Sequence, residues 1–183
     1  YAAERGFDVV EQEGEHYTWV LSRLAVELED LPSCHESFSI QTWVENVYRL
    51  FADRNFAILN KDDKPIGYVR SVWAMISMET RTPANLLALH GERITNSICE
   101  KECPIAKPGR VKVSQQEAVS EYVAKYSDLD INGHVNSIKY IEHILDLFPL
   151  DTYKEKALKR FEIAYVAESY YGDALSFYLE QKG

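Results

Sequence analysis

The stretch SDLDINGHVNSIKYIEHIL, residues 127–145, decides the fold because a polar loop in it runs directly into a helix. Apolar residues recur there at the spacing of one helical face and predict a helix over 135–148. These residues are Val135, Ile138, Ile141, Ile144, Leu145 and Phe148. Alternating patterns predict strands on both sides of the helix, over 117–128, 158–171 and 173–181. A helix set among antiparallel strands indicates the α+β class.

Strand patterns dominate the first half of the chain, at 17–30, twice within 37–60, and at 64–78. They are rich in β-branched and aromatic residues. The sequence NKDDKP at 60–65 is a turn signal between the last two strands. Residues 1–12 are interpreted as the end of a helix. The first half is thus predicted to be a helix followed by four antiparallel strands.

Both halves are predicted to have the same architecture, a long helix packed against an antiparallel sheet, which indicates two copies in tandem. The expected domains are 1–80 and 117–183, with a connector at 81–116 that contains three prolines and a short helix near 84–88. In the second domain, the two late strands are expected to join at Gly172-Asp173. The first domain lacks its start and the second stops early, so both termini are expected to be trimmed.

Composition excludes several classes of protein. Apolar residues make up 46 % of the 183-residue chain, enough for a core, and the net charge of −9 is opposite in sign to that of a typical nucleic-acid binder. No run of about 18 apolar residues predicts a membrane span. An odd count of three cysteines suits a reducing compartment. The pair Cys99 and Cys103, with His90 upstream, lacks the spacing of a zinc site, so neither a metal nor a cofactor is expected.

The polar loop concentrates groups that handle protons. Asp130, Asn132 and His134 are spaced by two, so in an extended segment their side chains point the same way, and Gly133 lets the chain bend. The helix that follows offers free amide groups and a positive dipole end to an oxyanion. Together these groups suit hydrolysis of an activated acyl compound. Ordinary helix capping and a surface histidine are the alternative interpretation.

The same stretch resembles a known family. SDLDINGHVNSIKYI is similar to the catalytic loop and helix of plant and bacterial acyl-ACP thioesterases, whose pattern is D-x-N-x-H-V-N. WVLSRLAVELE, IQTWVENV and SVWAMISMETR resemble first-domain strands of that family, in the same order, and the similarity covers about residues 1–180. The resemblance implies two tandem hotdog domains and hydrolysis of fatty acyl groups from acyl carrier protein. It also implies a place in the bacterial cytoplasm, or in the plastid stroma of a plant.

The resemblance implies one further catalytic acid. The family carries it in a Y-R-R-E-C-like stretch, which corresponds here to YVAES, with Glu168 as the acid and Ser169 in place of the cysteine. Loss of that cysteine argues against a thiol nucleophile, and Ser169 as a nucleophile has no clear sequence support. Taken alone, Glu168 would share a strand face with Ala164 and Val166, which tends to raise the pKa of a carboxyl group. An exposed strand end is the alternative.

The expected catalytic residues are therefore Asp130, Asn132, His134 and Glu168. Glu168, aided by Asn132, would activate water, His134 would donate to the thioester oxygen or the leaving sulfur, and Asp130 would hold His134 or Asn132. The carbonyl would point at the helix start. The expected substrate-binding residues are Val135, Asn136 and Ser169.

Three other functions stay open. The substrate carrier could be coenzyme A instead of acyl carrier protein. A hydratase or dehydratase acting on enoyl thioesters resembles D-x-N-P-x-H, whereas this chain has D-x-N-G-H. A non-catalytic acyl-thioester-binding module is disfavoured because all four polar positions are filled. Carrier protein is acidic like this chain, so docking would rely on the local bases Lys154, Lys156, Lys159 and Arg160. The two halves are expected to pair with each other, and a further homodimer stays open.

Overall fold

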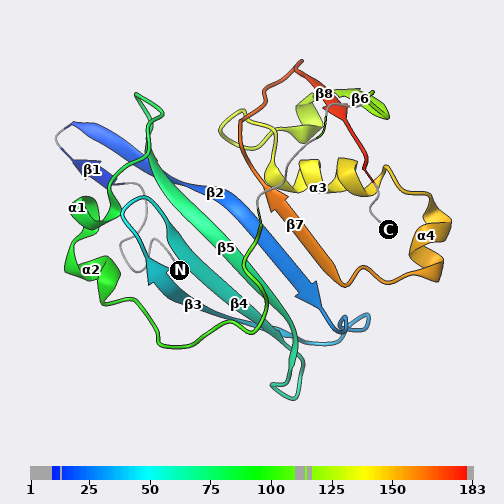
Figure 1. Ribbon diagram of the computed structural model, residues 1–183, viewed down its shortest axis with the longest axis horizontal. Coiled ribbons are helices and arrows are strands. Elements are labelled where there is room, and N and C mark those ends of the chain that lie inside the picture. The colour runs from blue at the N-terminus through cyan, green and yellow to red at the C-terminus, as the bar shows by residue number, and fades with distance from the viewer. Residues whose placement is uncertain (1–9, 13, 110–113, 115–116, 181–183) are drawn as a thin grey trace. The chain divides into compact units, whose positions relative to one another are not determined.

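The computed structural model describes residues 10–12, 14–109, 114 and 117–180 (Figure 1). The chain divides into two compact units. Unit 1 holds the chain up to Gly109 together with Lys159–Ala164, and unit 2 holds Arg110–Leu158 together with Tyr165–Gly183. The structural units are divided at other positions than the domains expected from the sequence. The expected domain boundaries stay a prediction. Each unit is described below by itself.

The described strands of unit 1 form one antiparallel sheet in the order β1-β2-β5-β4-β3, with β7 also paired to β2. The strands are β1 (Val10–Gln12), β2 (Glu15–Leu28), β3 (Ser39–Val47), β4 (Ala52–Leu59), β5 (Pro65–Ser77) and β7 (Arg160–Ala164). The four long strands, β2 to β5, confirm the strands predicted in the first half. Their length lets each strand carry its alternating pattern through many paired residues.

The predicted helix end at 1–12 is wrong for its last residues. Val10–Gln12 is the strand β1, which pairs antiparallel with the start of β2 in the register Val10↔Tyr17. The connection contains Gly14 at φ +83°, a conformation that glycine adopts without strain. Strand pairing across this tight turn outweighs the local helical pattern. Residues 1–9 lie outside the described part of the chain.

Two short helices follow β5. The predicted helix near 84–88 is confirmed as α1 (Leu86–His90), and α2 (Glu92–Thr95) comes directly after it. The side chain of Asn85 caps α1 by accepting from the amide groups of Leu87 and Ala88. Leu86 is fully buried and packs with Met75 and Ile94 in one core cluster of unit 1. Burial of this leucine fixes the helix against the end of the sheet.

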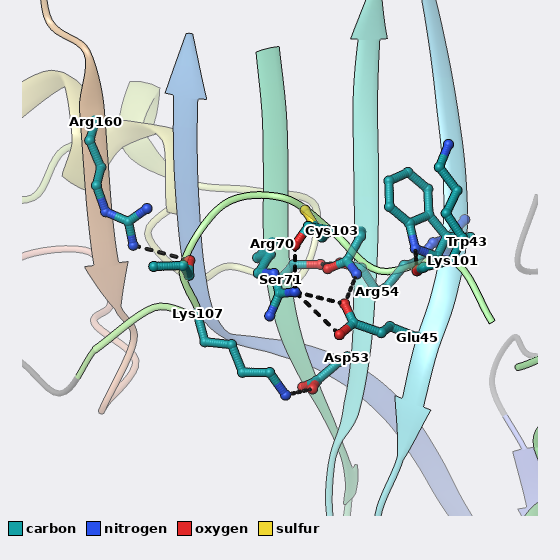
Figure 2. A network of polar contacts seen from close by, with 12 residues as sticks. Trp43, Glu45, Asp53, Arg54, Arg70, Ser71, Lys101, Cys103, Lys107 and Arg160 are labelled. Carbon is teal, nitrogen blue, oxygen red and sulfur yellow. Dashed lines mark hydrogen bonds and ion pairs between the residues drawn. The ribbon is translucent and has the colours of Figure 1, made fainter. Parts of the chain in front are cut away.

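Residues 99–109, which we name the strap, are bonded to several strands of unit 1 by a polar network (Figure 2). Arg70 in β5 pairs with Glu45 in β3 and donates to the main-chain oxygen of Cys103 at 2.8 Å. Lys107 pairs with Asp53 at 2.8 Å. Cys103 also packs with Trp43, Ala57 and Ile105 in a second core cluster. The strap therefore combines apolar packing with ion pairs.

The described residues of unit 2 form two helices, a 3₁₀ turn and a two-stranded antiparallel sheet. The elements are β6 (Ser120–Val123), η2 (Tyr126–Asp128), α3 (Ser137–Leu145), α4 (Leu150–Glu155) and β8 (Ala174–Phe177). The predicted helix over 135–148 is confirmed in its central part, and it is shorter because Asn136 caps its start and Asp146 ends it. The sequence did not predict α4.

The late strands differ from the expectation. The strand predicted over 158–171 is only β7, and it pairs with β2 instead of joining the next strand at Gly172-Asp173. The other late strand, β8, pairs with β6. The physical reason is that β2 offers an unpaired edge along residues 23–27, which β7 fills. The strand predicted over 117–128 is likewise shortened to β6.

Candidate active site

The loop before α3 is a tight turn. The amide of Asp130 donates to the main-chain oxygen of His134 at 2.8 Å, and the amide of Gly133 donates back to Asp130 at 3.1 Å. Gly133 has φ +82°, which glycine adopts most readily. The segment is therefore not extended, because the backbone reverses direction between Asp130 and His134, so the shared direction that an extended segment would give does not apply.

Asp130 holds this turn together through its side chain. Its Oδ1 atom accepts from the amide of Asn132 at 2.8 Å and from the amide of His134 at 3.2 Å. A carboxylate that satisfies two amide groups of its own turn is a common device in loops. Asp130 thus contacts both expected partners, Asn132 and His134, through their backbones. The Asn132 side chain is exposed.

His134 and Glu168 come together although they are distant in the sequence. The Nε2 atom of His134 lies 3.6 Å from the Oε2 atom of Glu168, and both side chains are partly exposed, at 24 % and 35 %. This separation permits an ion pair when the imidazole is protonated and exceeds a direct hydrogen bond. Catalytic contacts are often this long before substrate binds. The ring of Tyr170 lies edge-on to the imidazole at 5.1 Å between centroids.

Backbone pairing brings Glu168 to this position. The amide of Val135 donates to the main-chain oxygen of Ser169 at 2.8 Å, and His134 pairs with Tyr170 in an isolated antiparallel bridge. The hydroxyl of Tyr165 donates to the oxygen of Ser137, in the first turn of α3, at 3.1 Å. The segment that carries Glu168 is therefore anchored to the turn and to the helix.

The predicted strand face around Glu168 does not exist. β7 ends at Ala164, and Glu168 follows in an irregular segment. Val166 is 93 % exposed, so it forms no apolar stripe with Ala164 beside the carboxylate. The contacts of Glu168 come instead from the pairing of its neighbours with residues 134 and 135.

The start of α3 is largely satisfied by the protein itself. The side chain of Asn136 accepts from the amide of Ile138 at 3.0 Å, and the amide of Asn136 donates to the oxygen of Asp128 at 2.7 Å. Val135 is buried, and its amide is bonded to Ser169 as described above. Free amide groups at this helix start were expected to be available to an oxyanion. Three of them, those of Val135, Asn136 and Ile138, are bonded to acceptors of the protein instead. The capping interpretation is confirmed for Asn136.

Sequence reasoning missed a buried polar cluster beside the turn. Asp128 is 4 % exposed, and its Oδ2 atom accepts from the hydroxyl of Tyr122 at 2.8 Å and from the amide of Lys125 at 2.7 Å. The Nε2 atom of His143 lies 3.8 Å from its Oδ1 atom. Loop aspartates are usually exposed, so no signal in the sequence marked this one as buried.

The ionisation of Asp128 reflects these contacts. Burial disfavours its charged form, but the bonds from the Lys125 amide and the Tyr122 hydroxyl favour it, with help from the charge of Lys139. The balance places the pKa of Asp128 below its ordinary value, and the Asp128 bond raises the pKa of Tyr122. Asp128 is therefore an anion at neutral pH.

The described residues also bear on metal ions, thiols and membrane spans. Within the ranges that the structure describes, no group of three or more histidine, cysteine, aspartate or glutamate side chains is placed to hold a metal ion. Cys34 and Cys99 are exposed thiols, and Cys103 is a buried one. Of the helices that the structure describes, none has the length and apolar character needed to cross a membrane.

Comparison with known protein families gives two matches. The model of the acyl-ACP thioesterase N-terminal domain matches residues 3–88, and that of the acyl-ACP thioesterase C-terminal domain matches residues 111–183. A palmitoyl-acyl carrier protein thioesterase of Gossypium hirsutum, a chloroplastic protein, is 26 % identical over 156 residues, covering 82 % of this chain. This chain spans only 38 % of the length of that relative.

Solved structures agree. The crystal structure of an acyl-ACP thioesterase from Bacteroides thetaiotaomicron is 61 % identical, with a TM-score of 0.87 over 96 % of this chain and 70 % of that one. The 12:0-ACP thioesterase of Umbellularia californica shares the fold, with a TM-score of 0.71 at 19 % identity over 84 % of this chain and 62 % of that one. These likenesses confirm the predicted α+β hotdog class.

Proposed function

This chain belongs to the acyl-ACP thioesterase family, and from that premise we propose that it hydrolyses fatty acyl-ACP to free fatty acid and carrier protein. Such hydrolysis would end fatty acid elongation. The observation that carries the proposal is the approach of Glu168 to His134, at 3.6 Å, beside the turn that presents Asn132. A carboxylate and an imidazole at this separation can share the protons that thioester hydrolysis moves.

We assign the roles as follows. Glu168, with Asn132, would orient a water molecule and take its proton as the water oxygen attacks the thioester carbonyl. The carbon–sulfur bond then breaks, and His134 would donate a proton to the leaving sulfur. The products are a carboxylic acid and a thiol. Asp130 would keep Asn132 and His134 in place through the turn that it holds.

Substrate contacts are assigned to the residues around the helix start. Ser169 and Asn136 are partly buried, and Val135 is almost fully buried. Because the Asn136 side chain caps α3 and the Val135 amide is bonded to Ser169, these residues would shape the site more than bind the carbonyl oxygen. Their direct contact with substrate stays a prediction.

The carrier and the place of the reaction belong to the same proposal. Lys154 pairs with Asp151, and Arg160 pairs with Glu27 and Glu162, so two of the bases expected to dock an acidic carrier are already paired with carboxylates of the same chain. Acyl-CoA therefore stays an alternative substrate. We place the chain in the bacterial cytoplasm, or in the plastid stroma for a plant source. A homodimer stays an open prediction, which light scattering would check.

The central test is the variant Glu168→Gln, assayed for thiol release from acyl-ACP. Loss of the carboxylate that accepts the water proton should lower kcat by about 100-fold or more, the usual range for a general base. Glu155→Gln, on the exposed end of α4, is the matched control and should keep wild-type turnover. Near-normal turnover of Glu168→Gln, with wild-type circular dichroism, would remove Glu168 from the mechanism.

Substrate profiles separate the other functions. A series of acyl-ACP chain lengths, compared with the matching CoA thioesters, identifies the carrier from the ratio of kcat/KM values. With a crotonyl thioester, release of free thiol indicates hydrolysis, whereas loss of the enone absorbance without thiol indicates a hydratase. Absence of thiol release from the wild-type chain at every length would favour a binding module and contradict the proposal.

A further inference from the structure

Asp128 is a buried ionised residue that the mechanism above does not use. Its side chain is 5 % exposed, and charged side chains are almost never buried to this degree without partners. It lies two residues before Asp130, at the base of the turn that presents Asn132 and His134. The contacts of Asp128 must therefore explain why a charged carboxylate is buried at this position.

The backbone of Asp128 forms the base of a short ladder that ends at His134. The main-chain oxygen of Asp128 accepts from the amide of Asn136 at 2.7 Å. The next pair along the two segments is the bridge between Leu129 and Val135, and the amide of Asp130 then donates to His134 at 2.8 Å. Three successive pairings thus connect Asp128 to the imidazole-bearing residue.

The side chain of Asp128 fixes the base of this ladder to two elements. Its Oδ2 atom is bonded to the hydroxyl of Tyr122 in β6, and its Oδ1 atom faces Nε2 of His143, in the body of α3, at 3.8 Å. The rings of Tyr122 and His143 are in contact, with centroids 4.1 Å apart. His143 Nε2 is itself buried without a hydrogen bond in the described part of the chain. The carboxylate therefore lies between the strand and the helix that frame the site.

We propose that Asp128 is a positioning residue for thioester hydrolysis, which holds the ladder so that His134 stays within reach of Glu168. This inference rests on the proposed function, because the position of His134 matters for turnover only if His134 takes part in it. Asp128 acts through the turn and touches no reacting atom. Displacement of a catalytic group by about 1 Å can cost 100-fold in rate, so release of the ladder should be visible in kcat.

The test begins with Asp128→Ala in the full chain. Turnover of acyl-ACP should fall tenfold or more in kcat, with KM within about twofold of the wild type, because substrate contacts are unchanged. Asp146→Ala removes an exposed carboxylate at the other end of α3 and should leave both constants unchanged. A purely structural role would lower the melting temperature and leave the turnover of the folded fraction at the wild-type level, which would overturn the proposal.

A milder variant covers the case in which Asp128→Ala does not fold. Tyr122→Phe removes only the hydroxyl bonded to Asp128 and keeps the ring that packs against His143. It should lower kcat about threefold with KM unchanged. Suppose that Asp128→Ala is unfolded or fully active. A wild-type kcat in folded Tyr122→Phe would then contradict a positioning role for Asp128.

The imidazole resonance of His134 provides a readout that is independent of turnover. The chain has five histidines, so the His134 signal can be assigned by its loss in His134→Gln. It should shift in Asp128→Ala and in Tyr122→Phe and stay in place in Asp146→Ala. An unmoved signal in both site variants overturns the inference. If the wild-type chain releases no thiol, the proposed function fails, and this resonance still reports whether Asp128 positions His134.

Discussion

At the scale of single residues, several polar side chains of the candidate site are hydrogen-bonded to backbone amide groups. Asp130 accepts from two amide groups of its own turn, and Asn136 caps α3. Of the four expected catalytic residues, His134 and Glu168 approach each other through side-chain atoms. Loop architecture therefore explains part of the polar crowding before α3, and the proposed hydrolysis would explain the contact between His134 and Glu168.

The contacts of Asp130 lead to a prediction that separates these two explanations. Asp130→Asn keeps an oxygen that can accept from the amides of Asn132 and His134, whereas Asp130→Ala removes it. If Asp130 acts only by holding the turn, Asp130→Ala should lower kcat tenfold or more, and Asp130→Asn should stay within about threefold of wild type. Steady-state kinetics on one acyl thioester make the comparison. Equal losses in the two variants would show that the negative charge itself is needed.

At the scale of elements, ion pairs join strands to the segments between them. His16, at the start of β2, binds Glu79, just after β5, with 3.0 Å between Nδ1 and Oε1. The hydrogen bond to Glu79 raises the pKa of His16, and the same bond lowers the pKa of Glu79. Both side chains are about half exposed, so the pair is screened by solvent and salt.

The pH dependence of this pair follows from the two directions. A raised histidine pKa means that the stabilisation is complete below the ordinary value of 6.5 and is lost as pH rises through the folded-state pKa. A lowered glutamate pKa means that it is complete above 4.5 and is lost as pH falls through the folded-state pKa. His16→Gln should therefore lower the melting temperature most between pH 4.5 and 6.5. A difference from wild type that persists undiminished at about pH 9 would contradict this assignment.

The strap, residues 99–109, gives a second prediction for the elements. Arg70 and Glu45 are both largely buried, and Arg70 also binds the strap at Cys103. Arg70→Met leaves the Glu45 carboxylate without its cation and should lower the free energy of unfolding by about 3 kcal/mol. The double variant Arg70→Met/Glu45→Met should recover at least half of that loss. Urea denaturation measures both, and a double variant that is no more stable than the single one would show that the strap contact matters more than the buried charge.

The elements also show how far the sequence could predict the fold. Strands β2 to β5 were predictable because each alternates over many residues, and short turns join β3 to β4 and β4 to β5. α3 was predictable from its apolar face, apart from its ends. The length and pairing of β7 were predicted wrongly because its partner, β2, lies far away in the sequence. A local pattern does not show at which residue the pairing of two distant strands ends. Burial of Asp128 depends on Tyr122 and His143 from other elements and was not predictable for the same reason.

At the scale of the whole molecule, the net charge of −9 opposes an acidic carrier protein. Two of the bases expected to offset it are paired with carboxylates of the same chain. Added salt screens charges that are more than about 10 Å apart at 0.1 M ionic strength. Salt should therefore lower KM for acyl-ACP and leave KM for an uncharged acyl thioester unchanged. A KM for acyl-ACP that rises with salt would show that local attraction, through bases such as Lys156, controls docking.

The placement of β7 has a consequence for the synthesis of this chain. Unit 1 is discontinuous, since its sheet takes up residues 159–164 only after the polypeptide has passed through most of unit 2. During translation, the edge of β2 along residues 23–27 stays unpaired by β7 until residues 159–164 have left the ribosome. A fragment that stops at Gly109 would display that edge to other nascent chains. A short peptide of the β7 sequence, supplied separately, would be its natural complement.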